Sequence, residues 1–152
     1  MELLKRREAW NITYNHALGE TASHFYVQIR DHAKIVGRRC GATGRVLVPP
    51  RAFSDQTLEP TTEWVDIGTG GRVETFTIVY EEFNGLPPPP YAFGYVLLDG
   101  ADTAIGGFFK GVDLSDPAKA AQALKVGTRV TTKFADKRIG DVLDFWFEPE
   151  GK

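Results

Sequence analysis

The sequence predicts a mainly β protein in which N-terminal helices are followed by a small turn-rich module and then by five strands. Three observations support this order. Apolar residues recur at helical spacing up to about residue 33, glycines and prolines interrupt residues 34–62, and alternating apolar residues mark residues 63–150. The chain has 152 residues, of which 42% are hydrophobic and 25% charged, as in ordinary globular domains.

Residues 1–33 are expected to form two helices. The first is predicted by residues at helical spacing: Leu3, Leu4, Arg7, Trp10 and Tyr14. Gly19 is expected to end it, and either Thr21 or Ser23 to cap a second helix. The segment is rich in aromatic side chains but has few long aliphatic ones. Two interpretations stay open, packing against the rest of the chain or docking on a partner, for Trp10, Tyr14, Phe25 and Tyr26.

Five strands are expected after residue 63, at residues 72–80, 91–98, 103–110, 128–135 and 141–147. A short helix is predicted at 116–124, because Pro117 follows Ser115 and Asp116 as at a helix start. Gly94, Gly106 and Gly107 fit bulges or tight bends. Five strands with such an insert fit a small barrel, of which the OB-fold is one, or the edge of a sandwich.

The turn-rich module contains a spacing typical of zinc sites. Cys40, Thr43, Ser54 and Thr57 stand where C-x-x-C, ten residues beginning with a glycine, and a second C-x-x-C would place four thiolates. Three of these positions hold hydroxyl groups, which do not replace thiolates as zinc ligands. We therefore predict a zinc-ribbon shape without zinc, and no other cofactor, at residues 34–62.

The order of these segments resembles a known family, the acyl-CoA-associated proteins that join a rubredoxin-like zinc ribbon to an OB-fold. The resemblance rests on Phe25-Tyr26, on residues 34–41 (KIVGRRCG), on Val48-Pro49-Pro50-Arg51, on residues 63–73 (EWVDIGTGGRV) and on residues 91–100 (YAFGYVLLDG). It implies a degenerate ribbon at 34–62 and a five-stranded OB-fold domain at 63–150.

The resemblance also implies a role. Members of this family are typically non-catalytic partners of thiolase-fold enzymes, such as thiolases, acyltransferases and aldolases. The chain is accordingly expected to stabilise a thiolase-fold subunit in a hetero-oligomer and to help hold acyl-CoA. A second hypothesis is a stand-alone OB-fold module that binds acyl-CoA or single-stranded nucleic acid.

Charge gives a candidate site for the phosphates of coenzyme A. The stretch 34–51 contains no acid and five bases, which are Lys34, Arg38, Arg39, Arg45 and Arg51. The alternative is pairing with the acidic stretch 55–82, which has seven acids and one base. Nucleic-acid binding is not favoured, because the net charge is −2 and acids flank the aromatic residues of the first two strands.

Catalytic groups are not expected. A third hypothesis, an acyltransferase that uses Cys40 as nucleophile, needs a nearby histidine, and His16, His24 and His32 are all distant in sequence. The histidines do not form a metal site either, since His24 and His32 would be about 12 Å apart along a helix. The four prolines at 87–90 predict a stiff loop, which lines a ligand channel, docks a partner or is only a rigid connection.

No run approaches the roughly 20 apolar residues that cross a bilayer, and the N-terminus lacks the apolar core of a secretory signal. We therefore expect a cytoplasmic location and no membrane partner.

Overall fold

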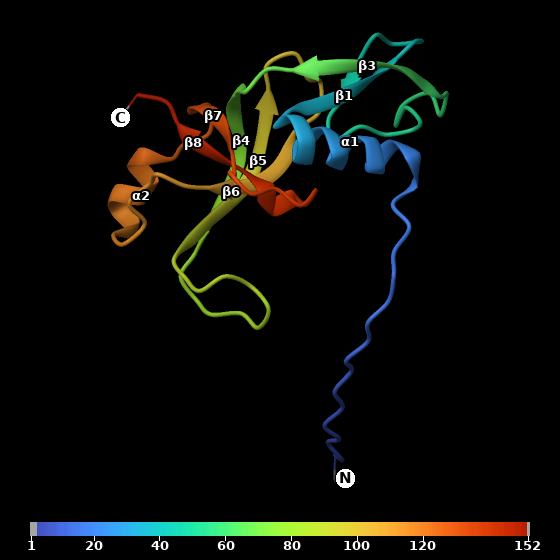
Figure 1. The fold of residues 1–152 in the computed structure, drawn as a ribbon. Coiled ribbons are helices and arrows are strands. Elements are labelled where there is room, and N and C mark those ends of the chain that lie inside the picture. Colours follow the sequence, from blue (N-terminus) through green and yellow to red (C-terminus); the bar gives the residue numbers. More distant parts are fainter. Residues whose placement is uncertain (1–2, 152) are drawn as a thin grey trace.

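The computed structural model describes residues 3–151, and its helix and two sheets are arranged as Figure 1 shows. Residues 3–18 form an arm without helix or strand, followed by α1 (Gly19–His32). The next three strands are β1 (Ile35–Cys40), β2 (Val46–Leu47) and β3 (Thr61–Ile67). The remaining elements are β4 (Gly70–Val79), β5 (Tyr91–Leu98), β6 (Ile105–Phe109), α2 (Pro117–Ala123), β7 (Arg129–Phe134), the 3₁₀ turn η1 (Val142–Asp144) and β8 (Phe145–Pro149).

The N-terminal part differs from the prediction of two helices. Residues 1 and 2 lie outside the described residues, and residues 3–18 are not helical. Gly19, expected to end a helix, begins one instead, with φ of 75°. The expected caps are also wrong, because Leu18 is the N-cap and no side chain caps α1. Asparagines and β-branched residues at 11–15 disfavour a helix in the arm.

The first three strands form a small antiparallel sheet in the order β2–β1–β3. In β1, Arg38 pairs with Leu47 of β2 on one side and with Trp64 of β3 on the other. The strand β3 thus includes residues 63–67, which had been expected to enter the barrel. The barrel strands themselves begin at Gly70.

The other five strands close into a barrel in the order β4–β5–β6–β8–β7, and β7 returns to β4. All pairs are antiparallel except β6 with β8, which meet in parallel at Phe109 and Phe147. A five-stranded closed barrel of this order is an OB-fold, so the barrel prediction is confirmed and the sandwich alternative is wrong.

The predicted elements of the barrel agree closely with the structure. The strand expected at 91–98 is β5, and Asp116 caps α2 by accepting hydrogen bonds from the Ala118 and Lys119 backbone N–H groups at 2.8 and 3.3 Å. The strand expected at 141–147 begins only at Phe145. Residues 142–144 form a 3₁₀ turn, because the Asp141 side chain accepts a hydrogen bond from the Leu143 N–H and caps the turn.

Gly94 of β5 lies where the backbone of β4 comes very close. A Cβ atom at this position would lie 2.2 Å from the Thr75 carbonyl oxygen and 2.7 Å from the Phe76 Cα. Gly94 pairs with Phe76 on one side and with Gly107 on the other, so it sits in a continuous ladder rather than at a bulge. Gly94 is therefore not at a bulge, and what the structure shows there is a close approach of the neighbouring backbone.

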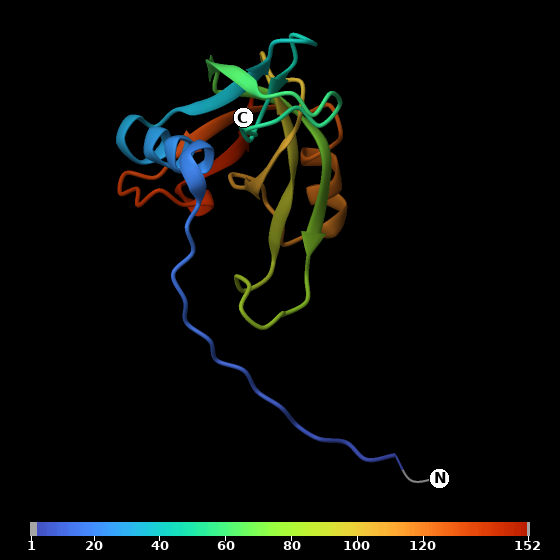
Figure 2. The ribbon, with the colours of Figure 1, turned by 90° about the vertical axis from the view of Figure 1, so that its right-hand side faces the viewer.

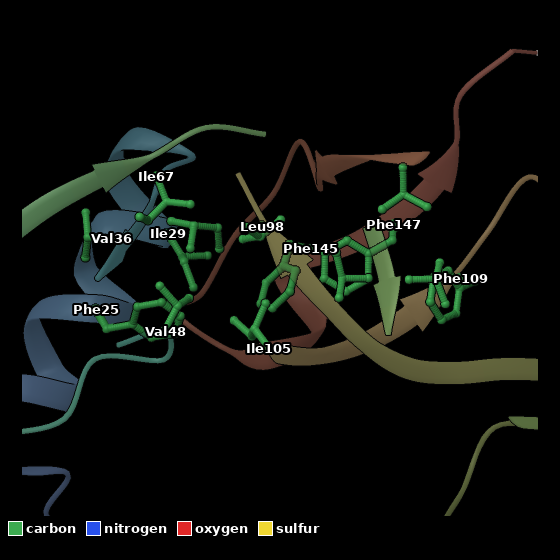
Figure 3. Close-up of a cluster of buried hydrophobic side chains, with 14 of the residues drawn as sticks. Phe25, Ile29, Val36, Val48, Ile67, Leu98, Ile105, Phe109, Phe145 and Phe147 are labelled. Carbon is green, nitrogen blue, oxygen red and sulfur yellow. The ribbon is translucent and has the colours of Figure 1, made fainter. Parts of the chain in front are cut away.

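One hydrophobic core joins the small sheet to the barrel. Figure 3 shows Phe25 and Ile29 of α1 beside Val36, Val48 and Ile67, and the same cluster continues through the barrel. The barrel's share of the labelled residues is Leu98, Ile105, Phe109, Phe145 and Phe147. The helix therefore closes the space between the two sheets, and neither side of the molecule has a separate core.

Candidate docking surface and the former ligand positions

The arm is the part of the molecule with the most exposed apolar surface. Trp10 is 80% exposed and Tyr14 74%, and residues 3–17 make no hydrogen bond, ion pair or ring contact with any other described residue. Five of its large apolar side chains are in this state: Leu3, Leu4, Trp10, Ile12 and Tyr14. Such a concentration on a segment without contacts is typical of a surface that binds another protein.

Residues 10–15 of the arm follow the alternation of a strand. Trp10, Ile12 and Tyr14 are apolar, while the residues between and after them are Asn11, Thr13 and Asn15. In an extended chain successive side chains point to opposite sides, so the three apolar side chains share one side. The spacing that suggested a helix used Trp10 and Tyr14 but left out Ile12. The extended conformation brings Ile12 into the candidate surface.

The other two predicted docking residues lie in α1 and behave differently. Phe25 is 4% exposed and packs in the core, which corrects its assignment to a partner surface. Tyr26 is half-buried, and its ring lies at 5.3 Å from that of Phe25. Burial and then the negative charge of Asp141 raise the pKa of Tyr26, so its hydroxyl stays neutral. For α1, the interpretation of packing against the chain holds.

Next to the arm, exposed apolar side chains continue over the loop 135–144. A hollow of about 230 Å³ lies between α1 and this loop, bordered by Leu18, Val27 and Ile139 among others. Ile139 is 69% exposed and Leu143 63%. The backbone of this loop is held in place by hydrogen bonds to the buried side chain of Asp144, which leaves these apolar side chains at the surface.

Asp144 organises the loop 135–144 through its carboxylate. The Oδ2 atom accepts hydrogen bonds from the backbone N–H groups of Ile139, Gly140 and Asp141 at 2.9, 2.7 and 2.9 Å. Burial raises the pKa of Asp144, but these bonds and the charge of Arg138 outweigh it, so the pKa is lowered overall. Arg138 also donates from Nε to the Arg30 carbonyl oxygen at 3.1 Å, which ties the loop to α1.

The β4–β5 loop adds a third apolar segment. Tyr80, Phe83 and Leu86 are between 43% and 55% exposed. Figures 1 and 2 show this loop and the arm leaving the body of the molecule in the same general direction. We call the arm, the loop 135–144 and the β4–β5 loop together the docking face.

The five predicted phosphate-binding bases all have partners within the small sheet and its loops. Lys34 Nζ lies 2.7 Å from Asp66 Oδ2, and Arg39 Nε lies 2.9 Å from Glu63 Oε2. Arg45 and Arg51 share Asp55, at 2.7 and 3.5 Å. The pairing is therefore with the acidic stretch that follows them in sequence, the alternative to a phosphate site.

Arg38 has a different environment. Its guanidinium donates to the Thr61 carbonyl oxygen, and its Cζ lies 4.8 Å from the centroid of the Trp64 ring. Because neighbours in a strand point to opposite sides, Arg38 and Arg39 face opposite sides of the small sheet. The bases therefore do not form one cluster.

The four positions of the predicted zinc spacing, Cys40, Thr43, Ser54 and Thr57, do come together. Cys40 is fully buried, and its Sγ lies 3.8 Å from Thr57 Oγ1. Hydrogen bonds with the side chains of Thr43 and Ser54 and with the Thr43 backbone lower the pKa of Cys40 from 9.0 to about 6, although burial acts in the opposite direction. Ser54 Oγ also accepts from the Gln56 and Thr57 backbone N–H groups, both at 3.3 Å. The two turns are thus arranged around one point.

This donor set does not fit zinc. One thiol and three hydroxyls lack the thiolate, imidazole or carboxylate ligands that a tetrahedral zinc site needs. Among residues 3–151 no group of three or more His, Cys, Asp and Glu is arranged to hold a metal ion. The absence of zinc and of other cofactors stays a prediction.

No catalytic arrangement links the histidines to Cys40 by any contact in the described part of the chain. His24 stacks on Trp64 with ring centroids 4.0 Å apart, so it helps pack α1 on the small sheet. Cys40 contacts hydroxyl groups rather than a general base. None of the described helices is long and apolar enough to span a membrane.

Comparison with known proteins supports the fold. Residues 64–135, from within β3 to just beyond β7, match the family model described as the ChsH2 C-terminal OB-fold domain. A search of curated proteins found no significant match.

Two solved structures resemble almost the whole chain. One is a protein of unknown function from the DUF35 family of Sulfolobus solfataricus, with a TM-score of 0.64, 17% identity, and 87% of each chain covered. The other is the Ltp2–ChsH2(DUF35) aldolase, with a TM-score of 0.63 and 16% identity, covering 88% of this chain and 98% of that chain. At such identities the likeness shows the fold alone. It extends over the small sheet as well as the barrel.

Proposed function

We propose that this chain is a non-catalytic accessory subunit of a thiolase-like enzyme complex, of the thiolase, acyltransferase or aldolase type. Its role is to stabilise the enzyme subunit, and the docking face is the surface that contacts it. The observation that carries the proposal is the arm, which presents five large apolar side chains and whose residues 3–17 make no hydrogen bond, ion pair or ring contact with other described residues. The structural likeness to a chain of an Ltp2–ChsH2(DUF35) aldolase supports the enzyme class.

The mode of docking follows from the alternation in the arm. An extended segment with Trp10, Ile12 and Tyr14 on one side adds to the exposed edge of a partner's sheet, where the backbone supplies hydrogen bonds and alternate side chains enter pockets. The basic run Lys5-Arg6-Arg7 precedes this segment and favours an acidic surface beside that edge.

Holding acyl-CoA is a second part of the proposed role, and the partner supplies most of it. Each of the four ion-paired bases would have to exchange a carboxylate for a phosphate, and surface pairs of this kind are weak enough to exchange. Titration of the complex with CoA at two salt concentrations tests this, because phosphate-driven binding weakens steeply with salt.

The main test is co-expression of this chain with a thiolase-fold enzyme subunit. Size-exclusion chromatography with light scattering should show a stable hetero-oligomer. Replacing Trp10, Ile12 and Tyr14 together by alanine should weaken it about a thousandfold, since two buried aromatic anchors at ~2 kcal/mol each sum to ~4 kcal/mol. The matched control replaces Asn11, Thr13 and Asn15 by alanine and should bind as the wild type does.

Two results would contradict the proposal. A wild-type chain that remains a monomer beside the enzyme would remove the accessory role. If Leu3→Ala weakened the complex and Ile12→Ala did not, the arm would dock as a helix, because Ile12 lies outside the set of residues at helical spacing.

A further inference from the structure

A cavity of about 350 Å³ lies at one end of the barrel, apart from the small sheet and its former ligand positions. It opens between the start of β5, the end of β6 and the start of β8, and the end of the proline loop borders it. The volume is in the range of pockets that hold small organic molecules. Of the sequence patterns, only the four prolines at 87–90 pointed to this place, with a ligand channel as one of three alternatives for their loop.

The walls are aromatic and are held in position. Tyr91 and Phe108 meet edge to face with ring centroids 5.8 Å apart, and Phe145 is 2% exposed. The Trp146 indole N–H donates to Glu148 Oε1 at 2.7 Å, which fixes the plane of the ring. Pro87 and Pro90 add a stiff border. A pocket whose walls are already ordered loses little entropy when a ligand enters.

One charged side chain borders the cavity among its described lining residues, and it is Lys110. Its ammonium group lies 3.7 Å from the centroid of the Trp146 ring. Lys110 has no ion pair with any described residue, whereas the bases of the small sheet have carboxylate partners. The carboxylate of Glu148 accepts its hydrogen bond from the indole N–H of Trp146, and Glu148 is not among the residues that line the cavity. An apolar cavity with one unpaired cation at its border favours a ligand that is apolar with one anionic group.

We propose that this cavity binds small amphipathic carboxylates, with the hydrocarbon body against Tyr91, Phe108 and Trp146 and the carboxylate at Lys110. The inference is independent of the accessory role, because it concerns the chain alone. Polyanions such as CoA are poorly matched, since one ammonium group balances one negative charge.

Calorimetric titration of the full chain with octanoate, octanol and butyrate tests the proposal. Octanoate should bind tighter than octanol, and the affinity should rise about fourfold for each methylene between butyrate and octanoate, because each buried methylene contributes a constant increment. Phenylpropanoate is a parallel probe, and whichever acid binds tighter shows whether the site takes a chain or a ring.

Lys110→Met keeps the apolar stem and removes the charge. It should lower octanoate affinity about tenfold and leave octanol affinity unchanged. The matched control is Lys137→Met, an exposed lysine that does not line the cavity and should bind octanoate normally. Leu143 borders the cavity and is 63% exposed, so Leu143→Asp should leave folding unaffected. This variant should weaken the binding of octanoate more than the binding of octanol.

No octanoate binding by the wild-type chain would overturn the proposal. So would equal affinity for octanoate and octanol, or an octanoate affinity that Lys110→Met leaves unchanged. Absence of a chain-length dependence would likewise overturn it, because it would place the ligand on the surface rather than in the cavity.

Discussion

The small sheet and the barrel are built from similar strands but are closed in different ways. The barrel is closed by strand pairing, with Phe109, Phe145 and Phe147 filling its interior. The small sheet has three strands, and around Cys40 its interior is polar, with a buried Ser54. Its apolar residues, such as Val36 and Val48, pack instead into the core shared with α1 and the barrel.

This difference indicates where the small sheet obtains its stability. A three-stranded sheet needs a hydrophobic face packed against other elements to be stable, and β2 of this sheet has only two residues. In this chain the core shared with α1 and the barrel supplies that packing. The hydroxyl groups at positions 43, 54 and 57 then need only to satisfy one another and the nearby backbone.

The largest expected effect on this comparison comes from introducing thiolates at the three hydroxyl positions. The triple variant Thr43→Cys, Ser54→Cys and Thr57→Cys should bind one Co²⁺ or Zn²⁺ per chain with tetrahedral geometry, because the four positions already surround one point. The binding free energy should approach the ~10–16 kcal/mol of structural sites. The visible absorption spectrum of Co²⁺ and zinc analysis of the purified protein measure it.

The wild-type chain is the control and should bind neither ion at this site. A triple variant whose Co²⁺ spectrum is octahedral would show that the two turns are not arranged as a metal site. Zinc at one equivalent in the wild-type protein would show that the hydroxyl positions do not prevent metal binding.

The shared core can be tested at Ile29, which is fully buried at the junction. Ile29→Ala should lower the free energy of unfolding by about 2–5 kcal/mol. Urea unfolding followed with either Trp64 or Trp146 as the sole tryptophan should give coincident transitions, because the two sheets share one core. Val27→Ala, at an exposed position of the same helix, should change stability by no more than about 0.5 kcal/mol. Separate transitions would mean that the small sheet is an independent unit.

Most of the barrel could be predicted from the sequence because its strands carry local signals. Alternation and turn residues located β5, and Asp116 with Pro117 located α2. The misplaced strand start at residue 141 has a local cause in side-chain to backbone hydrogen bonds. Asp144 accepts three backbone N–H groups of its own loop, and apolar periodicity does not report such hydrogen bonds.

The candidate site was less predictable. The spacing of Cys40 and the three hydroxyl residues was sufficient to bring those positions together, because turn geometry is local. The arm was misassigned because Trp10 and Tyr14 fit both a helical and an alternating pattern, and Ile12 distinguishes the two. The cavity at Lys110 was not predicted at all, since its walls come from three strands and a loop far apart in sequence. Only the four prolines at 87–90 gave a partial signal.

Gly94 inside the barrel and Gly41 in the turn after β1 differ in how tightly they are packed. A Cβ at Gly94 would lie 2.2 Å from a backbone oxygen, whereas nothing lies within 4 Å of a Cβ at Gly41. Gly94→Ala should therefore destabilise the protein by about 3 kcal/mol, the upper range for overpacking. Gly41→Ala should be within about 0.5 kcal/mol of wild type. Thermal unfolding of the two variants measures this difference, and equal effects would contradict a barrel closed by tight strand contact.

The smallest expected effect concerns the loop 135–144, which packs against α1. This loop is organised by the ionised side chain of Asp144, whereas the small sheet has neutral hydroxyl groups in its interior. Asp144→Asn keeps the shape of the side chain but removes its charge, so the hydrogen bonds from residues 139–141 should weaken by about 1 kcal/mol in total. Because the folded pKa of Asp144 is lowered from 3.8, the unfolded state binds the proton more strongly. The difference in the free energy of unfolding between wild type and Asp144→Asn should therefore be constant above the ordinary pKa of 3.8. It should shrink as the pH falls through the lowered pKa that Asp144 has in the folded state. Urea unfolding at several pH values measures it, with the exposed Asp136→Asn of the same loop as control. A difference that grows as the pH falls would show that Asp144 is held in its neutral form.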